Sequence, residues 1–471
     1  MLILLLVGIF HVRVPLAHAN TINVPADQPS IQAAIDSAGP GDTIRVSPGT
    51  YHEDIVIKSP LVQVVGASRD TTIIDGQGGG IIVWINASSV EFTGFTVRNS
   101  QRYGWGIHVE QATNVNITSD AISTNSGDGE GVNLSGVSTA IVEGNVFSDN
   151  LYGVNVTNSN HVRVTNNQAV SNDTIGVQLK ASTQCLVFNN SFQSGEDGID
   201  ILESSFNNSI TRNLIKDMTI DGIALQTDSN RSPVPQFPQN NTINENTFAR
   251  NHIGVNLQNE TLNTFYHNDF FQSIFRQVNP VENSASFFVI VKPNTWDNSS
   301  LGGLVGGNFW DDYSGVDANG DGIGDTPYVI GRENQDSRPL MAPFGPEPVL
   351  IQSIRATPSG GVAPLSVIFS STVTGSLTPF SYSWNFGDGS LAFSVNPQHE
   401  FARAGNYTVS LTVRDSSGST DNRVILVRVT APQQASYPVW IIVGAVAGLL
   451  VAALLVWTRR RRKRARLRMR N

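Results

Sequence analysis

Two short stretches of the chain carry residues whose types and spacing could do chemistry. The stretch SGEDGIDILESS places four acids within eight residues, namely Glu196, Asp197, Asp200 and Glu203. Paired carboxylates are the groups that most glycoside hydrolases use to cleave a sugar linkage. The stretch DANGDGIGD, residues 317–325, alternates oxygen-bearing side chains with glycine, which is typical of a loop that holds a hard cation. Both stretches need a scaffold that brings their side chains together.

The first stretch is one copy of an internal repeat. A Gly-(Ile/Val)-x-(Val/Leu/Ile) step begins at positions 106, 131, 153, 176, 198, 222 and 254. A second step with Asn between apolar residues lies between these copies, as in VEGNVF, VFNNSF and INENTF. Apolar and polar residues alternate within each run, as in a strand with one buried face. A period of roughly 23 residues with two or three short strands predicts a right-handed parallel β-helix over residues 20–345.

Other repeat folds fit less well. A leucine-rich repeat is excluded because its leucine pattern and helical half are absent, and a β-propeller needs about 40 residues per blade. One bend of each coil repeats an asparagine, which predicts a ladder of side-chain amides at Asn167, Asn190, Asn213 and Asn246. The segment DQPSIQAAIDSAG predicts a short amphipathic helix, capped by Asp27, that covers the first end of the stack.

Alignment of the coils on the repeated glycine reduces the number of candidate functional residues in the acidic stretch. Ile199 and Ile201 then belong to the core. Asp197 and Asp221 become neighbours on adjacent coils, about 5 Å apart at the backbone, and Asp200 lies on the same outer face. Close like charges raise the pKa of one carboxyl group, which gives an acid and a base from one pair. These three aspartates are therefore the candidate catalytic residues.

Two interpretations of this face stay open. One is a polysaccharide groove with hydrolase, lyase or epimerase activity, in which Tyr103, Trp105 and Tyr152 stack on sugar rings. The other is the solvated polar face of a scaffold that binds or presents carbohydrate. No arginine occupies the aligned positions to neutralise a uronate, so the sequence favours binding over catalysis.

Calcium is the metal that the second stretch predicts. A D-x-N-x-D-G-x-x-D pattern offers the side-chain oxygens of Asp317, Asn319, Asp321 and Asp325. The glutamate that ends an EF-hand loop is replaced by Tyr328, so a further ligand would have to come from Asp311 or Asp312. The alternative is an acidic, glycine-rich turn that binds no ion.

The two ends of the chain predict export and a membrane anchor. Residues 1–19 combine the apolar run LILLLVGIF with AHA, which is typical of a signal peptide. Residues 437–457 carry no charge and suffice to cross a hydrocarbon core of about 30 Å. The tail, residues 458–471, holds nine of the 30 basic residues and is expected to stay in the cytoplasm. The remaining, strongly acidic part of the chain argues against nucleic-acid binding, and the single Cys185 excludes an internal disulfide.

Residues 349–430 predict a second all-β domain, and residues 431–436 link it to the expected anchor. WNFGDGS followed by HEFARAGNYTVSLTVRD closely resembles the PKD domain, an immunoglobulin-like β-sandwich. The resemblance implies a spacer or binding module outside the cell. Trp384 and Phe386 are expected in its core.

Two motifs of the first domain also resemble known families. IQAAIDSAGPGDTIRVSPGTY resembles the opening of secreted β-helix proteins, including pectin methylesterases and the carbohydrate-binding and sugar-hydrolase repeat group. GGNFWDDYSGVDANGDGIGDTPYVI, residues 306–330, resembles the end of NosD-like periplasmic proteins, which implies copper delivery to nitrous oxide reductase; the same segment type occurs in archaeal surface proteins. The histidines are scattered with no pair at ligand spacing, so a copper site is not expected.

These observations lead to one expected function and two alternatives. We expect a single-pass membrane protein that displays its β-helix and PKD domains outside the cell. Its expected role is to bind or present an envelope polysaccharide or glycoprotein, or to mediate adhesion. The first alternative is a polysaccharide-processing enzyme that uses the acidic cluster, and the second is a copper maturation factor.

Overall fold

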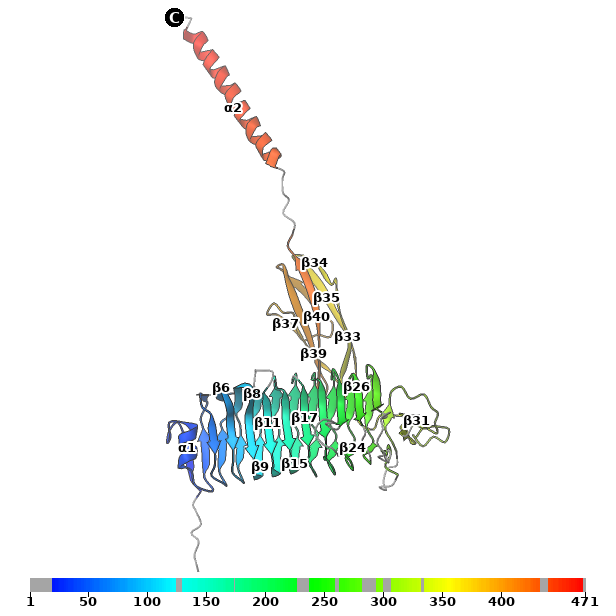
Figure 1. The fold of residues 1–471 in the computed structure, drawn as a ribbon. Helices are drawn as coiled ribbons and strands as arrows, with labels where there is room; N and C mark the ends of the chain where they lie inside the picture. Colours follow the sequence, from blue (N-terminus) through cyan, green and yellow to red (C-terminus); the bar gives the residue numbers. More distant parts are fainter. Residues whose placement is uncertain are drawn as a thin grey trace, which may run out of the picture. The chain divides into compact units, whose positions relative to one another are not determined.

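The computed structural model describes residues 19–123, 129–172, 174–226, 237–258, 262–281, 294–299, 306–331, 334–432 and 439–468. The chain divides into two compact units between Pro346 and Glu347. The first unit is a stack of β-coils and the second is a β-sandwich (Figure 1). The expected all-β fold class, a parallel β-helix followed by a PKD-type sandwich, is confirmed for these two units.

One face of the first unit is a sheet of eleven parallel strands. In spatial order these are β1 (Thr21–Val24), β2 (Thr43–Val46), β5 (Gln63–Gly66), β7 (Glu91–Thr93), β9 (Thr113–Thr118), β12 (Ser138–Glu143), β15 (Asn160–Thr165), β18 (Leu186–Phe188), β21 (Ser209–Thr211), β24 (Thr242–Asn244) and β27 (Thr264–Tyr266). Each strand pairs in parallel with the same position of the next coil, as the repeat predicts.

The other two faces are joined by two long strands, β6 (Thr72–Ile85) and β8 (Thr96–Glu110), which each run through both. One of these faces adds β3 (Gly49–Tyr51), β10 (Ala121–Ser123), β13 (Val146–Ser148), β16 (Gln168–Val170), β19 (Ser191–Gln193), β22 (Leu214–Lys216), β25 (Thr247–Ala249), β28 (Asp269–Phe271) and β30 (Phe309–Trp310). The other adds β4 (Ile55–Ile57), β11 (Glu130–Ser135), β14 (Tyr152–Thr157), β17 (Ile175–Lys180), β20 (Asp197–Leu202), β23 (Asp221–Gln226), β26 (Ile253–Gln258) and β29 (Arg276–Val281). We call the run from β8 through β11 to β29 the site ladder.

Close packing between coils explains the repeated glycine of the site ladder. Ile199 and Ile201 are fully buried on either side of the outward-facing Asp200. A Cβ atom added to Gly198 would lie 2.5 Å from the main-chain oxygen of Gly222 and 2.6 Å from Cγ2 of Ile215. Such distances are too short for any side chain, so the glycine is needed because two coils approach each other closely rather than because of an unusual φ.

The expected amide ladder is confirmed and extends beyond the predicted residues. The Oδ1 atom of Asn190 accepts the main-chain N–H of Asn167 at 2.9 Å and its side-chain N–H at 3.0 Å. The same pattern links Asn145, Asn167, Asn190, Asn213, Asn246, Asn268 and Asn308. An aspartate side chain lies at each end of this series, Asp120 at the first and Asp336 at the last. The ladder satisfies buried main-chain donors at every bend.

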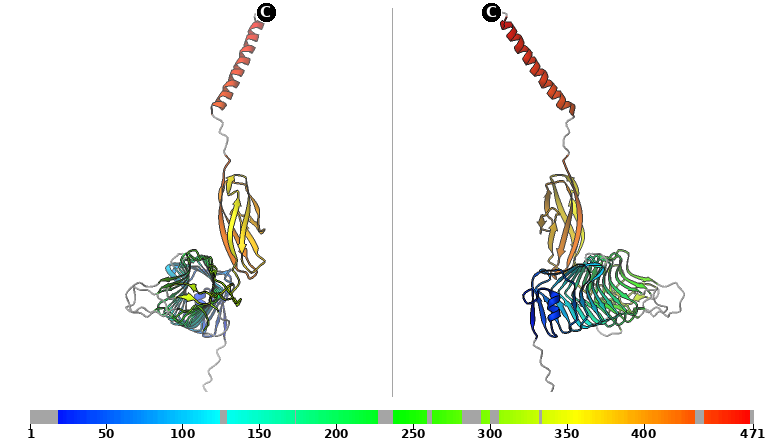
Figure 2. Two further views of the ribbon diagram at one scale, coloured as in Figure 1. Left: turned by 90° about the vertical axis from the view of Figure 1, so that its right-hand side faces the viewer. Right: turned by 60° about the vertical axis from the view of Figure 1, so that its left-hand side comes forward.

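A short helix, α1 (Ile31–Ser37), covers the first end of the stack (Figure 2). Its residues Ile31, Ala34 and Ile35 are buried, as the sequence predicts. The expected N-cap at Asp27 is wrong, because Ser30 accepts the N–H of Ala33 at 3.1 Å. Asp27 instead accepts both the main-chain and side-chain N–H groups of Asn23, which holds it in the preceding turn.

The second unit is a sandwich of two sheets. One contains β33 (Leu350–Thr357), β35 (Leu365–Thr374) and β38 (Gln398–Phe401), and the other β34 (Gly360–Val362), β40 (Thr420–Thr430), β39 (Gly405–Arg414), β36 (Ser381–Asn385) and β37 (Leu391–Ala392). Trp384 and Phe386 are buried in its core, as expected from the sequence.

Two further elements complete the description. The first unit carries a small two-stranded sheet of β31 (Tyr328–Val329) and β32 (Gln335–Asp336) near its last coil. The last helix of the chain is α2 (Val439–Arg468). Across the part of the chain that the structure describes, no helix meets the length and hydropathy that a membrane crossing requires.

Candidate active site

The three candidate aspartates lie together on the site ladder. Asp200 in β20 pairs with Gln178 of the preceding coil and with Ala224 of the following coil. Asp197 begins β20 and Asp221 begins β23. The register that the repeated glycine predicts is therefore the register of the structure. We call Asp197, Asp200 and Asp221 the acidic cluster.

Main-chain and amide groups hold the acidic cluster in place. The main-chain N–H of Asp221 donates to Oδ1 of Asp197 at 2.8 Å. Asn256 Nδ2 donates to Oδ2 of Asp221 at 2.8 Å, and Gln226 Nε2 lies 3.5 Å from Oδ2 of Asp200. Among the described residues, the buried Oδ1 atoms of Asp200 and Asp221 have no hydrogen-bond partner. The cluster thus holds two buried oxygen atoms that its surroundings leave unsatisfied.

The acidic cluster is largely buried, whereas the sequence predicted that this row of side chains faces solvent. Asp200 is 2% exposed and Asp221 is 3% exposed, whereas Asp197 is half-buried. The members of the row in the preceding coils are also buried, namely His108, Asn133, Asn155 and Gln178, whereas Asn256 is half-buried. Strands about 4.8 Å apart bring side chains of adjacent coils into contact, so each one covers its neighbour. Asp197 is consequently the member of the cluster that solvent or a ligand can reach.

Burial and mutual repulsion change the acidity of the cluster. Burial, together with the charge of Asp221, raises the pKa of Asp197 to about 7. Burial, followed by the charges of Asp197 and Asp221, raises the pKa of Asp200 well above its usual range. Burial also raises the pKa of Asp221, but Asn256 and His252 oppose this shift. A proton is therefore held on the cluster near neutral pH.

Aromatic and polar side chains continue the site ladder toward its earlier coils. Trp105 stacks on His108 with ring centroids 4.4 Å apart, and Nδ1 of His108 lies 2.9 Å from Oδ1 of Asn133. The carboxylate of Glu130 accepts the side-chain N–H of Asn133 at 2.6 Å. Burial, and then the charges of Glu130 and Asp200, raise the pKa of Tyr152. Of the three aromatic residues expected to stack on sugars, Trp105 and Tyr152 occupy aligned positions of this ladder, each paired with Glu130.

The third aromatic residue, Tyr103, lies in the same strand β8 and is 68% exposed. Arg102 lies over its ring at 5.0 Å. The sequence analysis assigned no role to His252 or Asn256, which contact or influence Asp221. The alignment on glycine places Asn256 in the position that Asp200 fills two coils earlier, but it does not indicate the hydrogen bond to Asp221. His252 lies outside the aligned step, so the repeat gave no signal for it.

The expected calcium loop satisfies much of its own hydrogen bonding. Asp317 accepts the main-chain N–H groups of Gly320, Asp321 and Gly322 at 2.6 to 3.1 Å. Asp325 accepts the N–H of Ala318 at 2.7 Å. Asn319 accepts the main-chain N–H of Asp321 at 3.0 Å.

The two carboxylates considered as further calcium ligands are engaged elsewhere. Gln272 donates its main-chain N–H to Asp311 at 2.6 Å, and the Tyr328 hydroxyl donates to Asp312 at 3.2 Å. Tyr328 itself stacks on Trp310, with ring centroids 4.3 Å apart. It therefore packs against the last coil and does not replace the missing EF-hand ligand.

The described side chains do not fit copper. No group of three or more His, Cys, Asp or Glu residues is placed to hold a metal ion within the described ranges. Cys185 is buried, which raises the pKa of its thiol to about 11 and disfavours the thiolate that binds metals. Soft-metal sites need clustered soft ligands.

The fold and the site together define a parallel β-helix protein with a buried acidic cluster on one face and a β-sandwich domain that follows in the chain. Residues 36–217 and 85–315 match the model of the family described as periplasmic copper-binding protein (NosD). These matches together span more than half of the chain, so the protein belongs to the NosD family. Residues 345–430 match the PKD domain.

Similar curated proteins share only a short stretch with this chain. Collagenase ColA of Bacillus cereus is 45% identical over 56 residues, which is 12% of this chain and 6% of the collagenase. The pre-pro-metalloprotease PrtV of Vibrio cholerae is 36% identical over 52 residues, which is 11% of this chain and 6% of the protease. The chain therefore spans only a small part of these relatives.

Solved structures similar to the chain include two polysaccharide enzymes. An alginate lyase from Paenibacillus sp. str. FPU-7 has a TM-score of 0.43 and 16% identity, over 56% of this chain and 97% of the lyase. The A-module of the mannuronan C-5 epimerase AlgE4 of Azotobacter vinelandii has a TM-score of 0.37 and 17% identity, over 55% and 95%. The PKD1 domain of Vibrio anguillarum Epp is 30% identical, with a TM-score of 0.16, over 19% and 100%.

Proposed function

We propose that the chain binds a polysaccharide along the site ladder and hydrolyses a glycosidic bond at the acidic cluster. One observation carries this proposal. The half-buried Asp197, with its pKa raised to about 7, lies against two buried carboxyl groups. A scaffold that only presents sugar does not need such an arrangement, because buried carboxyl groups with an unsatisfied oxygen atom are unfavourable. The geometry thus favours catalysis over the binding role that the sequence alone favoured.

The three aspartates have different roles in this proposal. Asp197 is the reachable member and donates its proton to the leaving glycosidic oxygen. Asp221 is the ionised member in this proposal, because Asn256 and His252 oppose the rise that burial causes in its pKa, and it stabilises the positive charge that develops on the sugar. Asp200 is a positioning residue, since burial and the charges of Asp197 and Asp221 raise its pKa, so that it stays protonated beside them. Water then adds to the sugar carbon, supplies the hydroxyl group of the new reducing end and returns its other proton to Asp197.

The charge of the site favours a neutral glycan. The chain has a formal net charge of −9. Lys180, which lies one coil from the cluster, pairs with Glu203 at 3.4 Å and is thereby directed to another carboxylate. A lyase or epimerase that acts on uronates must neutralise the substrate carboxylate, whereas a hydrolase of neutral glycans needs no such cation. Trp105 and Tyr152 offer ring faces on which neutral sugars stack.

The test is a panel of neutral and acidic polysaccharides incubated with the full chain. The proposal expects new reducing ends from at least one neutral glycan. Unsaturated products from an acidic glycan would instead indicate a lyase. Binding without any product would restore the role of a carbohydrate-presenting scaffold, and neither binding nor product from any glycan would exclude both functions.

We propose further that the protein is exported and anchored in the cell membrane. The uncharged residues 437–457 and the nine basic residues that follow them support this proposal. The PKD domain then serves as a spacer between the anchor and the β-helix. Membrane fractionation tests the anchor, since the full chain should resist extraction with alkaline buffer. A chain that ends at residue 432 should be released into the medium, and recovery of the full chain there would contradict the anchor.

A further inference from the structure

A second row of asparagine side chains, separate from the amide ladder described above, is interrupted beside the acidic cluster. Successive coils place Asn150, Asn172, Gly195, Met218 and Asn251 at the bend that follows the strands β13, β16, β19, β22 and β25. Where asparagines are adjacent, the side-chain N–H of Asn150 donates to Oδ1 of Asn172 at 3.2 Å. Further along, Oδ1 of Asn251 accepts the main-chain N–H of Met218 at 3.0 Å. Gly195 and Met218 supply no such acceptor, so the amide row stops for two coils.

The interruption leaves one buried donor unsatisfied. Asn172 is 4% exposed, and among the described residues its Nδ2 atom has no hydrogen-bond partner. Its counterpart Asn150 donates to a main-chain oxygen as well as to the next asparagine. A buried amide N–H group without an acceptor destabilises the folded protein. An external acceptor that binds at this position would remove that destabilisation.

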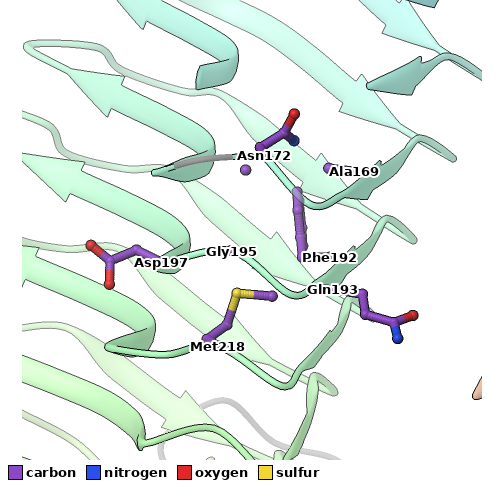
Figure 3. A pocket seen from close by; sticks show the side chains of 8 residues that line it. Ala169, Asn172, Phe192, Gln193, Gly195, Asp197 and Met218 are labelled. Carbon is purple, nitrogen blue, oxygen red and sulfur yellow. The ribbon is translucent and has the colours of Figure 1, made fainter. Parts of the chain in front are cut away.

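A small pocket lies at the interruption (Figure 3). It is open to solvent, and its empty space of about 150 Å³ includes open solvent, so only a small part of the pocket is enclosed. Its inner wall is formed by the buried residues Asn172, Phe192 and Met218, and its rim by the partly exposed Gln193 and Asp197. The pocket therefore combines apolar walls with a single unsatisfied hydrogen-bond donor.

The backbone does not require glycine at position 195. The φ angle of Gly195 is not in the left-handed region, and an added Cβ would lie 3.3 Å from the main-chain oxygen of Asn172 as its nearest neighbour. A shift of a few tenths of an ångström would accommodate a side chain there. An asparagine at this position would continue the amide row, give Asn172 its acceptor and fill the pocket.

We propose that this pocket binds an acetyl group carried by the polysaccharide, an inference that rests on the proposed function. The carbonyl oxygen of the acetyl group accepts the N–H of Asn172, and its methyl group packs against Phe192 and Met218. In Figure 3 the carboxylate of Asp197 points away from these two side chains. The acetyl group and the bond to be cleaved thus lie on opposite sides of the Asp197 main chain, so the acetylated sugar is adjacent to the cleavage point.

The substitution Gly195→Asn tests the inference, with the full chain and two matched oligosaccharides as probes. Chitohexaose carries acetyl groups and cellohexaose does not. The wild type should bind chitohexaose at least about tenfold more tightly, and saturation-transfer NMR should detect contact at the acetyl methyl groups. Gly195→Asn should reduce binding of chitohexaose to the level of cellohexaose while its melting temperature stays equal or rises.

A second variant separates loss of the donor from occlusion of the pocket. Asn172→Asp keeps the oxygen that accepts from Asn150 and removes the N–H group, and it should lose the same preference. Equal binding of both oligosaccharides by the wild type, or an unchanged preference in Gly195→Asn, would overturn the inference. In that case Asp197→Asn still tests the proposed function by itself, because cleavage of a non-acetylated glycan that depends on Asp197 requires no acetyl pocket.

Discussion

The main-chain N–H of Asp221 donates to the carboxylate of Asp197 at 2.8 Å, across the gap between two adjacent coils. This bond fixes the reachable carboxyl group of the acidic cluster to the coil that carries a second carboxyl group. It also opposes the rise in the pKa of Asp197 that burial and the charge of Asp221 cause. The pKa of about 7 is the balance of these effects, and the proposed role of Asp197 as a proton donor depends on it.

The pH dependence of cleavage should reflect this balance. If Asp197 is the general acid, it must be protonated, so kcat/KM should fall by about tenfold for each pH unit above pH 7. The measurement is a pH profile of kcat/KM on a cleaved glycan. A rate that stays constant between about pH 6 and pH 9 would exclude Asp197 as the acid.

Replacement of Asp200 should leave this profile in place. Burial and the charges of Asp197 and Asp221 raise the pKa of Asp200 well above its usual range, so Asp200→Asn removes no charge and the loss of rate should begin at the same pH as in the wild type. The same variant should be more stable than the wild type at pH 8, because an amide is neutral without having to bind a proton. A loss of rate that begins at a lower pH in the variant would show that Asp200 carries a charge that acts on Asp197.

Asp120 provides a test of the amide ladder far from the site. Its Oδ1 atom accepts the N–H of Phe95 at 2.8 Å, and complete burial raises its pKa well above the usual range. The folded protein therefore holds this proton more tightly than the unfolded chain does. The stability that depends on this proton is greatest below about pH 4 and is lost as the pH rises through the folded pKa.

Asp120→Asn should consequently stabilise the protein at neutral pH, by about 1–2 kcal/mol. The new amide can also donate to Phe92, because the equivalent Asn145 donates to the main-chain oxygen of Ile117 and Ile117 pairs with Phe92. Urea unfolding at pH 5 and pH 8 measures the effect, which should be larger at pH 8. A variant less stable than the wild type at pH 8 would contradict a protonated Asp120.

Calcium binding at residues 317–325 stays a prediction. Calcium at millimolar concentration should raise the melting temperature of the full chain, and Asp321→Asn should remove this effect. Glu91→Gln, which changes a carboxylate on the eleven-stranded sheet, serves as the control. An equal melting temperature with calcium and with a chelator would show that the loop folds through its own hydrogen bonds.

The repeat made much of the first unit predictable. Its period determines the register, so alignment on Gly198 and Gly222 was enough to bring Asp197, Asp200 and Asp221 together and to predict the asparagine ladder. The burial of Asp200 was not predictable in the same way. It depends on how far the side chains of adjacent coils cover one another, and the polar pattern of the row contains no information on that.

The sequence also did not decide between alternative local structures. Asp27 and Ser30 are both capping residues three positions apart, and the hydrogen bonds of Asp27 to Asn23 decide between them. The sequence did not indicate the pocket at Gly195, because glycine is common at bends. The structure shows that Gly195 interrupts the row of Asn150, Asn172 and Asn251 and that an amide of this row is left unsatisfied.

The most direct test of the proposed hydrolase is the comparison of Asp197→Asn with the wild type on a neutral glycan that the wild type cleaves. We predict that the variant loses at least about a hundredfold in kcat, as expected for removal of a general acid, while its affinity for the glycan changes little. Glu91→Gln should retain the wild-type rate. Cleavage by Asp197→Asn at the wild-type rate would contradict the central claim.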